Sequence, residues 1–307
     1  MSEQSVGVLG VGRLGSDVAF TLAERDLCDI VLYDTDRERA EYLASDLTDT
    51  SFGHVYNRRV SWVDDISGLA QCSVVLVTAG ARRAPQTTAG QLFGQNRQIA
   101  REVADALTGS STLFVVATEP VDLMTAELAR LLRLPPSRVM GIGGIVDSFR
   151  VRSELGNVLS VGPDYIRAHV VGPHDSDAEI VWDFASIKGS PVRSIATDAD
   201  LAAVEAAFRT DSDARLVQMT ESFSRYTPAM ACLELLRSIV KDDRRVLSVT
   251  MPWVDVLGIS GVAMGIPAVV GRFGAERPVA PDLDGDARSR LEQCAKRLAA
   301  MMEGGVA

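Results

Sequence analysis

The chain has 307 residues, of which 47% are hydrophobic and 23% charged, and its formal net charge at pH 7 is −10. These values are typical of a soluble globular protein with one or two domains, and they argue against a broad nucleic-acid-binding surface, which needs clustered Lys and Arg. No apolar run reaches membrane-spanning length, and the segment 1–10 lacks the basic and apolar regions of a signal peptide. We therefore expect a cytoplasmic protein.

Strand and helix patterns alternate through the first half of the chain. Short apolar runs predict strands at 5–10, 29–34, 73–80, 112–118 and 138–143, and amphipathic stretches between them predict helices at 14–25, 36–47, 91–108 and 122–133. Continuous apolar runs suit parallel strands that are buried on both faces. The alternation predicts an α/β fold with a doubly wound parallel sheet.

The pattern changes near residue 145. The second half predicts a strand at 168–172, one long helix around 213–241, strands at 246–251 and 266–271, and a final amphipathic helix at about 286–303. We expect two domains: residues 1–145 form the doubly wound sheet, and residues 146–307 form an α+β domain that packs tightly on the first.

The cysteines and histidines give no sign of a metal site. The four cysteines are widely separated and form no C-x-x-C pair: Cys28, Cys72, Cys232 and Cys294. The three histidines are equally scattered: His54, His169 and His174. We expect reduced cysteines and no structural metal.

A glycine motif, G-x-G-x-x-G, stands between the first strand and the first helix, at Gly10, Gly12 and Gly15. At this place the glycines allow a tight turn, close approach of a pyrophosphate, and close packing of helix on strand, while the helix N-terminus attracts phosphate. Asp34, at the end of the second strand, suits a ribose hydroxyl pair and would repel a 2′-phosphate. The pattern predicts an NAD site; the alternative is a glycine-rich turn without a dinucleotide.

Seven motifs in this order resemble the lactate/malate dehydrogenase family: "GVLGVGRLG", "LYDTD", "LASDL", "VTAGARRAP", "PVDLMT", "VDSFR" and "VVGPHDSD". The resemblance covers nearly the whole chain and implies a Rossmann domain followed by a substrate domain. It implies reversible hydride transfer between NAD and a 2-hydroxy acid, in a homodimer or homotetramer. The residues expected to bind NAD are Gly10, Gly12, Arg13, Leu14, Gly15, Asp34, Thr78, Ala79 and Gly80.

The resemblance assigns roles to four further residues. His174 matches the catalytic acid/base, Asp147 the carboxylate that orients it, and Arg150 the arginine that binds the substrate carboxylate. Thr227 falls where the family often has a Thr or Ser that lines the substrate pocket. Taken singly, each residue has a simpler interpretation: a loop histidine, a helical salt bridge between Asp147 and Arg150, and a helix cap at Thr227.

The chain departs from the family in its substrate loop, residues 78–92. Arg83 stands at a specificity position, where an arginine resembles malate-type members and could bind a second carboxylate. Ala89 stands where the family has the arginine that closes over the substrate and polarises its carbonyl. Loss of one such polarising group typically costs about a hundredfold or more in rate.

A second departure is Glu119, in "ATEPVD", where the family has an asparagine. Together with the loss at Ala89, this exchange removes a positive charge and adds a negative one, which opposes binding of a small anionic keto acid. We expect Glu119 to face the cleft near His174 and to pair with an amine, an imine or an extra hydroxyl of the substrate. Alternatively, Glu119 turns away and Ala89 reflects decay of the site.

These observations favour an NAD-dependent oxidoreductase that acts on a non-standard 2-hydroxy or 2-keto carboxylic acid. Lactate or malate dehydrogenase proper is one alternative. A second is an enzyme that reduces imino acids or oxidises amino acids on the same scaffold. A third is a non-catalytic NAD-binding protein.

Overall fold

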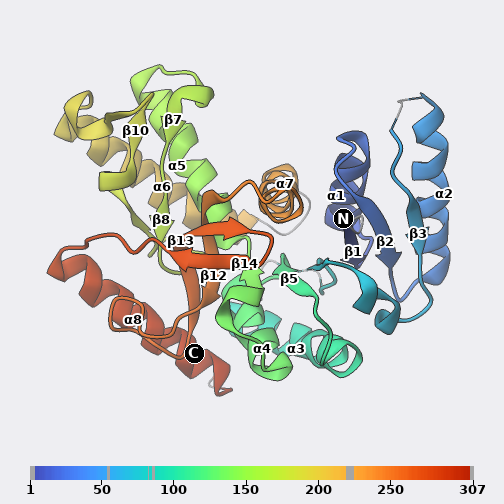
Figure 1. Ribbon diagram of the computed structural model, residues 1–307. Coiled ribbons are helices and arrows are strands. Elements are labelled where there is room, and N and C mark those ends of the chain that lie inside the picture. The colour runs from blue at the N-terminus through green and yellow to red at the C-terminus, as the bar shows by residue number, and fades with distance from the viewer. Residues whose placement is uncertain (1–3, 54–55, 82, 85–86, 219–224, 305–307) are drawn as a thin grey trace.

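A nine-stranded sheet runs through the centre of the protein (Figure 1). The computed structural model describes residues 4–53, 56–81, 83–84, 87–218 and 225–304, and His54 lies outside these ranges. The sheet has the order β14-β13-β12-β6-β5-β4-β1-β2-β3. Six strands are parallel: β1 (Ser5–Leu9), β2 (Asp29–Tyr33), β3 (Val60–Trp62), β4 (Val74–Val77), β5 (Leu113–Val116) and β6 (Val139–Gly141).

This parallel part has the Rossmann strand order, in which the chain reverses direction across the sheet between β1 and β4. Three antiparallel strands from the second half extend the same sheet: β12 (Arg245–Pro252), β13 (Ala263–Gly271) and β14 (Gly274–Pro278). The halves join where β12 pairs with β6, at Thr250 and Gly141. The predicted fold class is therefore confirmed.

Helices cover both faces of the sheet (Figure 1). One face carries α1 (Arg13–Glu24), α2 (Arg37–Gly53), α5 (Gly143–Leu159) and α7 (Tyr226–Lys241). The other carries α3 (Ala89–Leu107), α4 (Val121–Leu132) and α8 (Gly285–Met302). Short 3-10 helices lie at Ile66–Gln71 and Pro136–Arg138. The middle strands are fully apolar and buried, as parallel strands between two helical layers must be.

A smaller lobe stands on α5, built from α6 (Asp198–Gln218) and two small sheets. One sheet pairs β7 (Ile166–Arg167), β10 (Ser186–Ile187) and β11 (Ser190–Pro191), and the other pairs β8 (Val170–Val171) with β9 (Glu179–Ile180). Its 3-10 helices are Pro163–Tyr165, Trp182–Phe184 and Val192–Ser194. The expected domain boundary at 145/146 falls inside α5, whose first turns pack in the main core and whose later turns pack in the core of this lobe.

The prediction of one helix over 213–241 is wrong, because the structure has two helices, α6 and α7. Pro228 gives the physical reason. It is tolerated in the first turn of α7, but in the interior of a longer helix it would remove a hydrogen bond and clash with the preceding turn. The strands β3 and β14 were not predicted. β3 is only three residues long, and the sequence of β14, "GAERP", contains a glycine, two charged residues and a proline instead of an apolar run.

No helix among the described residues combines the length and the apolar character needed to cross a membrane.

Candidate active site

The glycine motif forms the floor of a cleft at the end of β1. Gly10 has φ +97°, and a Cβ added there would lie 2.6 Å from the backbone nitrogen of Ala79. A Cβ on Gly15 would lie 2.0 Å from the carbonyl oxygen of Gly10, whereas one on Gly12 would meet nothing within 4 Å. Gly10 and Gly15 thus allow close packing of the backbone. Gly12 leaves open space before the N-terminus of α1, which has no side-chain cap and begins with Arg13 and Leu14. This arrangement fits a pyrophosphate.

Asp34 lies on the wall of this cleft, just after β2. Its carboxylate accepts hydrogen bonds from the backbone N–H groups of Val11 (2.8 Å) and Asp36 (2.9 Å). One Nη atom of Arg39 lies 3.8 Å from the same carboxylate. The cleft holds a cavity of about 320 Å³ lined by Gly10, Gly12, Asp34, Thr78, Ala79 and Gly80, among others. The residues present therefore fit NAD, with Asp34 placed for a ribose.

His174, Asp147 and Arg150 form one connected group. Nδ1 of His174 lies 2.7 Å from Oδ2 of Asp147, and Nη1 of Arg150 donates to Oδ1 of the same carboxylate at 2.9 Å. Asp147 and Arg150 lie one turn apart on α5, and Asp147 is fully buried. Because Asp147 holds Nδ1, the other ring nitrogen of His174, Nε2, is left for a reacting group.

Glu119 lies beside that second nitrogen, with its Oε1 3.7 Å from Nε2 of His174. Burial by itself lowers the pKa of His174, but the charge and hydrogen bond of Asp147 and the charge of Glu119 outweigh burial and the opposing charge of Arg150. They raise the pKa of His174 to about 9. The imidazole is therefore largely protonated at neutral pH.

The backbone around Glu119 is fixed by Asn96, a buried residue of α3 that sequence reasoning missed. Its amide nitrogen donates to the carbonyl oxygen of Glu119 (2.6 Å), and its amide oxygen accepts from the N–H of Ala81 (2.7 Å). The peptide bond between Glu119 and Pro120 is cis. Asn96 thus ties the start of the substrate loop to the segment that carries Glu119.

Asp122 and Thr250 were also missed. Oδ2 of Asp122 accepts the backbone N–H of His174 at 2.7 Å, and Oδ1 accepts the hydroxyl of Thr250 at 2.9 Å. Burial raises the pKa of Asp122 to about 7, against the lowering effect of these hydrogen bonds and of the His174 charge. In the sequence, the place of Asp122 in the first turn of a helix is explained by its favourable interaction with the helix dipole. No sequence signal therefore linked Asp122 to His174.

The remaining predicted residues are less closely connected. Nε of Arg83 donates to the carbonyl oxygen of Thr87 (3.2 Å). Ala89 is the first residue of α3, after the cap Thr88, and Thr227 is half-buried in the first turn of α7. Among the described residues, the polar partners of His174 are Asp122, Asp147 and Glu119, and Thr227 is not one of them.

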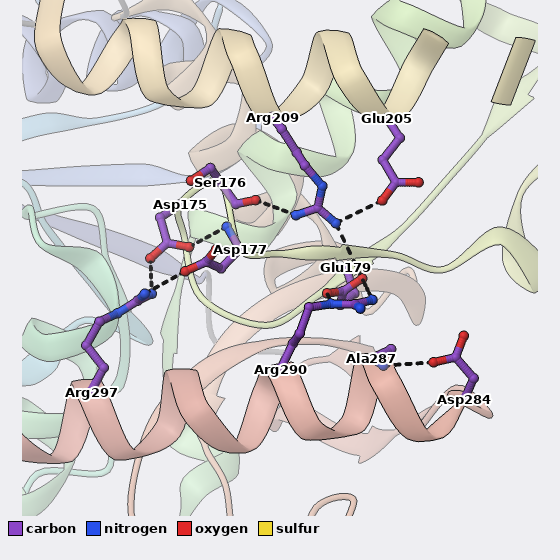
Figure 2. A network of polar contacts seen from close by, with 10 residues as sticks. All are labelled: Asp175, Ser176, Asp177, Glu179, Glu205, Arg209, Asp284, Ala287, Arg290 and Arg297. Atoms are coloured by element: carbon purple, nitrogen blue, oxygen red, sulfur yellow. Dashed lines mark hydrogen bonds and ion pairs between the residues drawn. The ribbon is translucent and has the colours of Figure 1, made fainter. Parts of the chain in front are cut away.

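The segment that follows His174 is held by arginines from two helices, as Figure 2 shows. Arg297 of α8 pairs with Asp175 (2.6 Å) and Asp177 (2.5 Å), and Arg209 of α6 donates to the carbonyl oxygen of Ser176 (2.7 Å). Arg290 of α8 binds Glu179 through both carboxylate oxygens. These contacts fix the backbone on the C-terminal side of His174.

Two family models together span the chain. The NAD-binding domain of lactate/malate dehydrogenase matches residues 4–141, and the α/β C-terminal domain of the same family matches residues 145–307. An L-lactate dehydrogenase from Thermus aquaticus is 31% identical over 302 residues, which cover 95% of this chain and 96% of that protein. A malate dehydrogenase from Chlorobium luteolum is 27% identical over 293 residues, or 94% of each chain.

Solved structures show the same fold. The malate dehydrogenase of Cryptosporidium parvum matches with a TM-score of 0.91 at 22% identity, over 98% of both chains. The lactate dehydrogenase of the same organism, solved with lactic acid and its nicotinamide cofactor, matches with a TM-score of 0.91 at 21% identity, over 99% of both. Together with the family models and the glycine cleft, these matches show that the chain belongs to the lactate/malate dehydrogenase family, whose members are NAD-dependent oxidoreductases acting on CH–OH groups.

Proposed function

We propose that the protein transfers hydride between NAD and a 2-hydroxy or 2-keto carboxylic acid that carries a cationic or hydrogen-bond-donating group. The observation that carries this proposal is the carboxylate of Glu119, 3.7 Å from Nε2 of His174. That nitrogen is the one left free by Asp147, so a substrate oxygen bound to it would lie next to Glu119. Plain lactate and malate, the substrates named for the relatives, offer no such group beyond the hydroxyl that reacts.

Arg150 supports a carboxylate on the substrate. Its Nη1 is used by Asp147, but its Nε is buried and has no hydrogen-bond partner among the described residues. A buried donor without a partner costs about 1–3 kcal/mol, which a bound carboxylate would recover. Arg150 is thus anchored on one side and unsatisfied on the other.

His174 is the acid/base in this proposal. The bound nicotinamide would supply or accept the hydride, and Nε2 of His174 would give the proton to the substrate oxygen in reduction and take it back in oxidation. Asp147 holds Nδ1 in its protonated form and stabilises the imidazolium. The high pKa of His174 keeps the proton-donating form dominant at neutral pH.

Electrostatics argue against a small anionic substrate without a compensating group. The position of the loop arginine is taken by Ala89, and Glu119 adds a carboxylate near the reacting oxygen. An ammonium, an iminium or a hydroxyl on the substrate would satisfy that carboxylate. Glu119 therefore also favours the second candidate, reduction of an imino acid, because a protonated imine already carries the charge that the loop arginine would otherwise supply.

A screen of NAD-linked turnover tests the proposal. It should compare simple 2-keto acids, 2-keto acids with an amino or hydroxyl group, bulky 2-keto acids, and amino acids. We expect the highest kcat/KM among acids with a donor group. Faster reduction of pyruvate or oxaloacetate would identify a conventional lactate or malate dehydrogenase, and no turnover at all would favour a non-catalytic NAD-binding protein.

The cofactor preference should depend on Asp34. We expect NADH to bind at least about tenfold more tightly than NADPH, a difference of roughly 1.4 kcal/mol, because the carboxylate repels a 2′-phosphate. In Asp34→Ser, Arg39 remains nearby and NADPH should gain affinity. Fluorescence titration measures both, with Asp49→Ser on the exposed side of α2 as the charge-matched control. Equal affinities in the wild type would remove Asp34 from its role.

The pH dependence should follow His174. Reduction needs the imidazolium, so its kcat/KM should be level near neutral pH and fall as pH rises through about 9; oxidation should rise over the same range. Glu119→Gln removes one of the charges that raise the pKa of His174, so both profiles should move to lower pH. Initial rates between pH 6 and 10 measure this shift, and unchanged midpoints in the variant would contradict it.

We also propose that the protein acts as a homodimer in the cytoplasm. Large apolar side chains stand exposed on the packed helices α1 and α7: Phe20, Tyr226 and Met230. A second copy covering them would bury this surface.

The proposed cytoplasmic location rests on the cysteines. All four are unpaired and buried, which suits a reducing compartment. Sedimentation equilibrium with the mass of one chain would contradict the dimer, and cell fractionation tests the location.

A further inference from the structure

Asp122 joins three segments that are far apart in the sequence. It lies in the first turn of α4, and its two oxygens accept from the backbone of His174, 52 residues away, and from Thr250 of β12, 128 residues away. Asp122 is 6% exposed and Thr250 is fully buried, so water does not compete for these hydrogen bonds. Two donors converge on two carboxylate oxygens. An amide at this position would have only one acceptor for them.

Gly143 closes the same group from the other side. A Cβ on Gly143 would lie 2.8 Å from the Cβ of His174 and 3.1 Å from the hydroxyl of Thr250. Gly143 opens α5, and Asp147 stands one turn later on the same helix. Helix α5 therefore constrains His174 in two places: the side chain of His174 fills the space beside Gly143, and Asp147 holds Nδ1.

We propose that Asp122, Thr250 and Gly143 form a His174 seat, a set of positioning residues that fixes the imidazole against Asp147 and directs Nε2 into the cleft. The inference rests on the proposed acid/base role of His174. The backbone of His174 is held by Asp122, its Cβ is confined by Gly143, and its Nδ1 is held by Asp147, so the ring has one orientation. In that orientation Nε2 faces Glu119.

The charged groups around the seat determine what its loss would do. Asp147 and Glu119 face the imidazole with negative charge, Arg150 faces it with positive charge, and Asp175 lies next to it in the chain, paired with Arg297. If the ring is released, Nδ1 loses its short contact with Asp147, and the pKa of His174 should fall toward its ordinary value of about 6.5.

Nuclear magnetic resonance of the NADH complex tests the seat without any need for turnover. The variants are Asp122→Asn and Thr250→Val, with Thr250→Ser as the conservative replacement. The readouts are the low-field Nδ1–H proton resonance of His174 and its pKa from the ring resonances. We expect Asp122→Asn and Thr250→Val to move the resonance upfield and to lower the pKa. Thr250→Ser should keep the resonance and the pKa of His174 at their wild-type values, because serine keeps the hydroxyl.

Two matched controls separate positioning from general destabilisation. Glu127→Gln removes another buried carboxylate of α4, which pairs with Arg97 and Arg130, and Thr112→Val removes another buried threonine hydroxyl, which donates to Cys72. Both should leave the His174 resonances unchanged. If folded Thr250→Val also leaves them unchanged, the seat is wrong, and Thr250 decides this even if Asp122→Asn does not fold. If the resonances move but His174→Asn keeps its turnover, the seat stands and the acid/base role fails.

Discussion

Replacement of His174 by asparagine should lower turnover by about a hundredfold or more, the usual contribution of a placed acid/base, while NADH affinity stays nearly unchanged. Asparagine can still hydrogen-bond to Asp147, but it cannot give a proton to the substrate oxygen. The glycine cleft that receives NAD lies on other elements, at β1, α1 and β2. Steady-state rates give the loss of turnover, and fluorescence titration gives the NADH affinity.

His169→Asn is the matched control. His169 is half-buried, and its ring nitrogen Nδ1 lies 3.3 Å from the hydroxyl of Ser248. Burial lowers its pKa to about 4, so a neutral asparagine preserves its charge state. That variant should keep its turnover. Asp147→Asn should also reduce the rate, because it weakens support for the imidazolium. Unchanged turnover of the true substrate by His174→Asn would contradict the mechanism.

The double variant Ala89→Arg with Glu119→Asn should shift the protein toward a simple keto acid, and Arg83 makes oxaloacetate the first one to test. The arginine supplies polarisation of the carbonyl, worth about a hundredfold or more, and the asparagine removes a competing negative charge. Each single variant should gain less than the pair. Values of kcat/KM for oxaloacetate in the wild type, the two single variants and the double variant measure the effect and its coupling.

Gly90→Arg with Glu119→Asn controls for charge alone. A Cβ at Gly90 meets nothing within 4 Å, so an arginine fits there but projects from a different side of α3. Either arginine stands at the N-terminus of a helix, where the dipole makes a cation unfavourable by about 0.3–1 kcal/mol. If Gly90→Arg with Glu119→Asn raised kcat/KM for oxaloacetate as much as the Ala89→Arg pair, the added charge, and not its position at residue 89, would control substrate preference.

The sequence predicted the fold class and the NAD cleft because both depend on local patterns. The apolar runs of β1, β2, β4, β5 and β6 follow one another with amphipathic helices between them, and the glycines act through their own backbone. The ends of these strands were less predictable. The run 73–80 pairs only over Val74–Val77, because the chain then turns to line the cleft.

Contacts that join distant parts of the chain were not predictable from one sequence. Asp122 reads as a helix-terminal acid until Thr250 and the backbone of His174 are placed against it. Asn96 reads as a polar residue on a helix until its amide is seen between Ala81 and Glu119. The sequence marked Glu119 as a departure from a family pattern and led us to expect it near His174, but the distance of 3.7 Å between its Oε1 and Nε2 of His174 comes from the fold.

The central claim is that Glu119 selects a substrate with a donor group, and one ratio tests it most directly. Hydroxypyruvate differs from pyruvate only by a hydroxyl group, so the quotient of their kcat/KM values with NADH measures the benefit of that donor. We expect the wild type to favour hydroxypyruvate by about tenfold, roughly one charge-assisted hydrogen bond. Glu119→Met, which is similar in size but replaces the charged acceptor by a weakly accepting thioether, should abolish the preference. A quotient near one in the wild type, or the same quotient in both proteins, would contradict the claim.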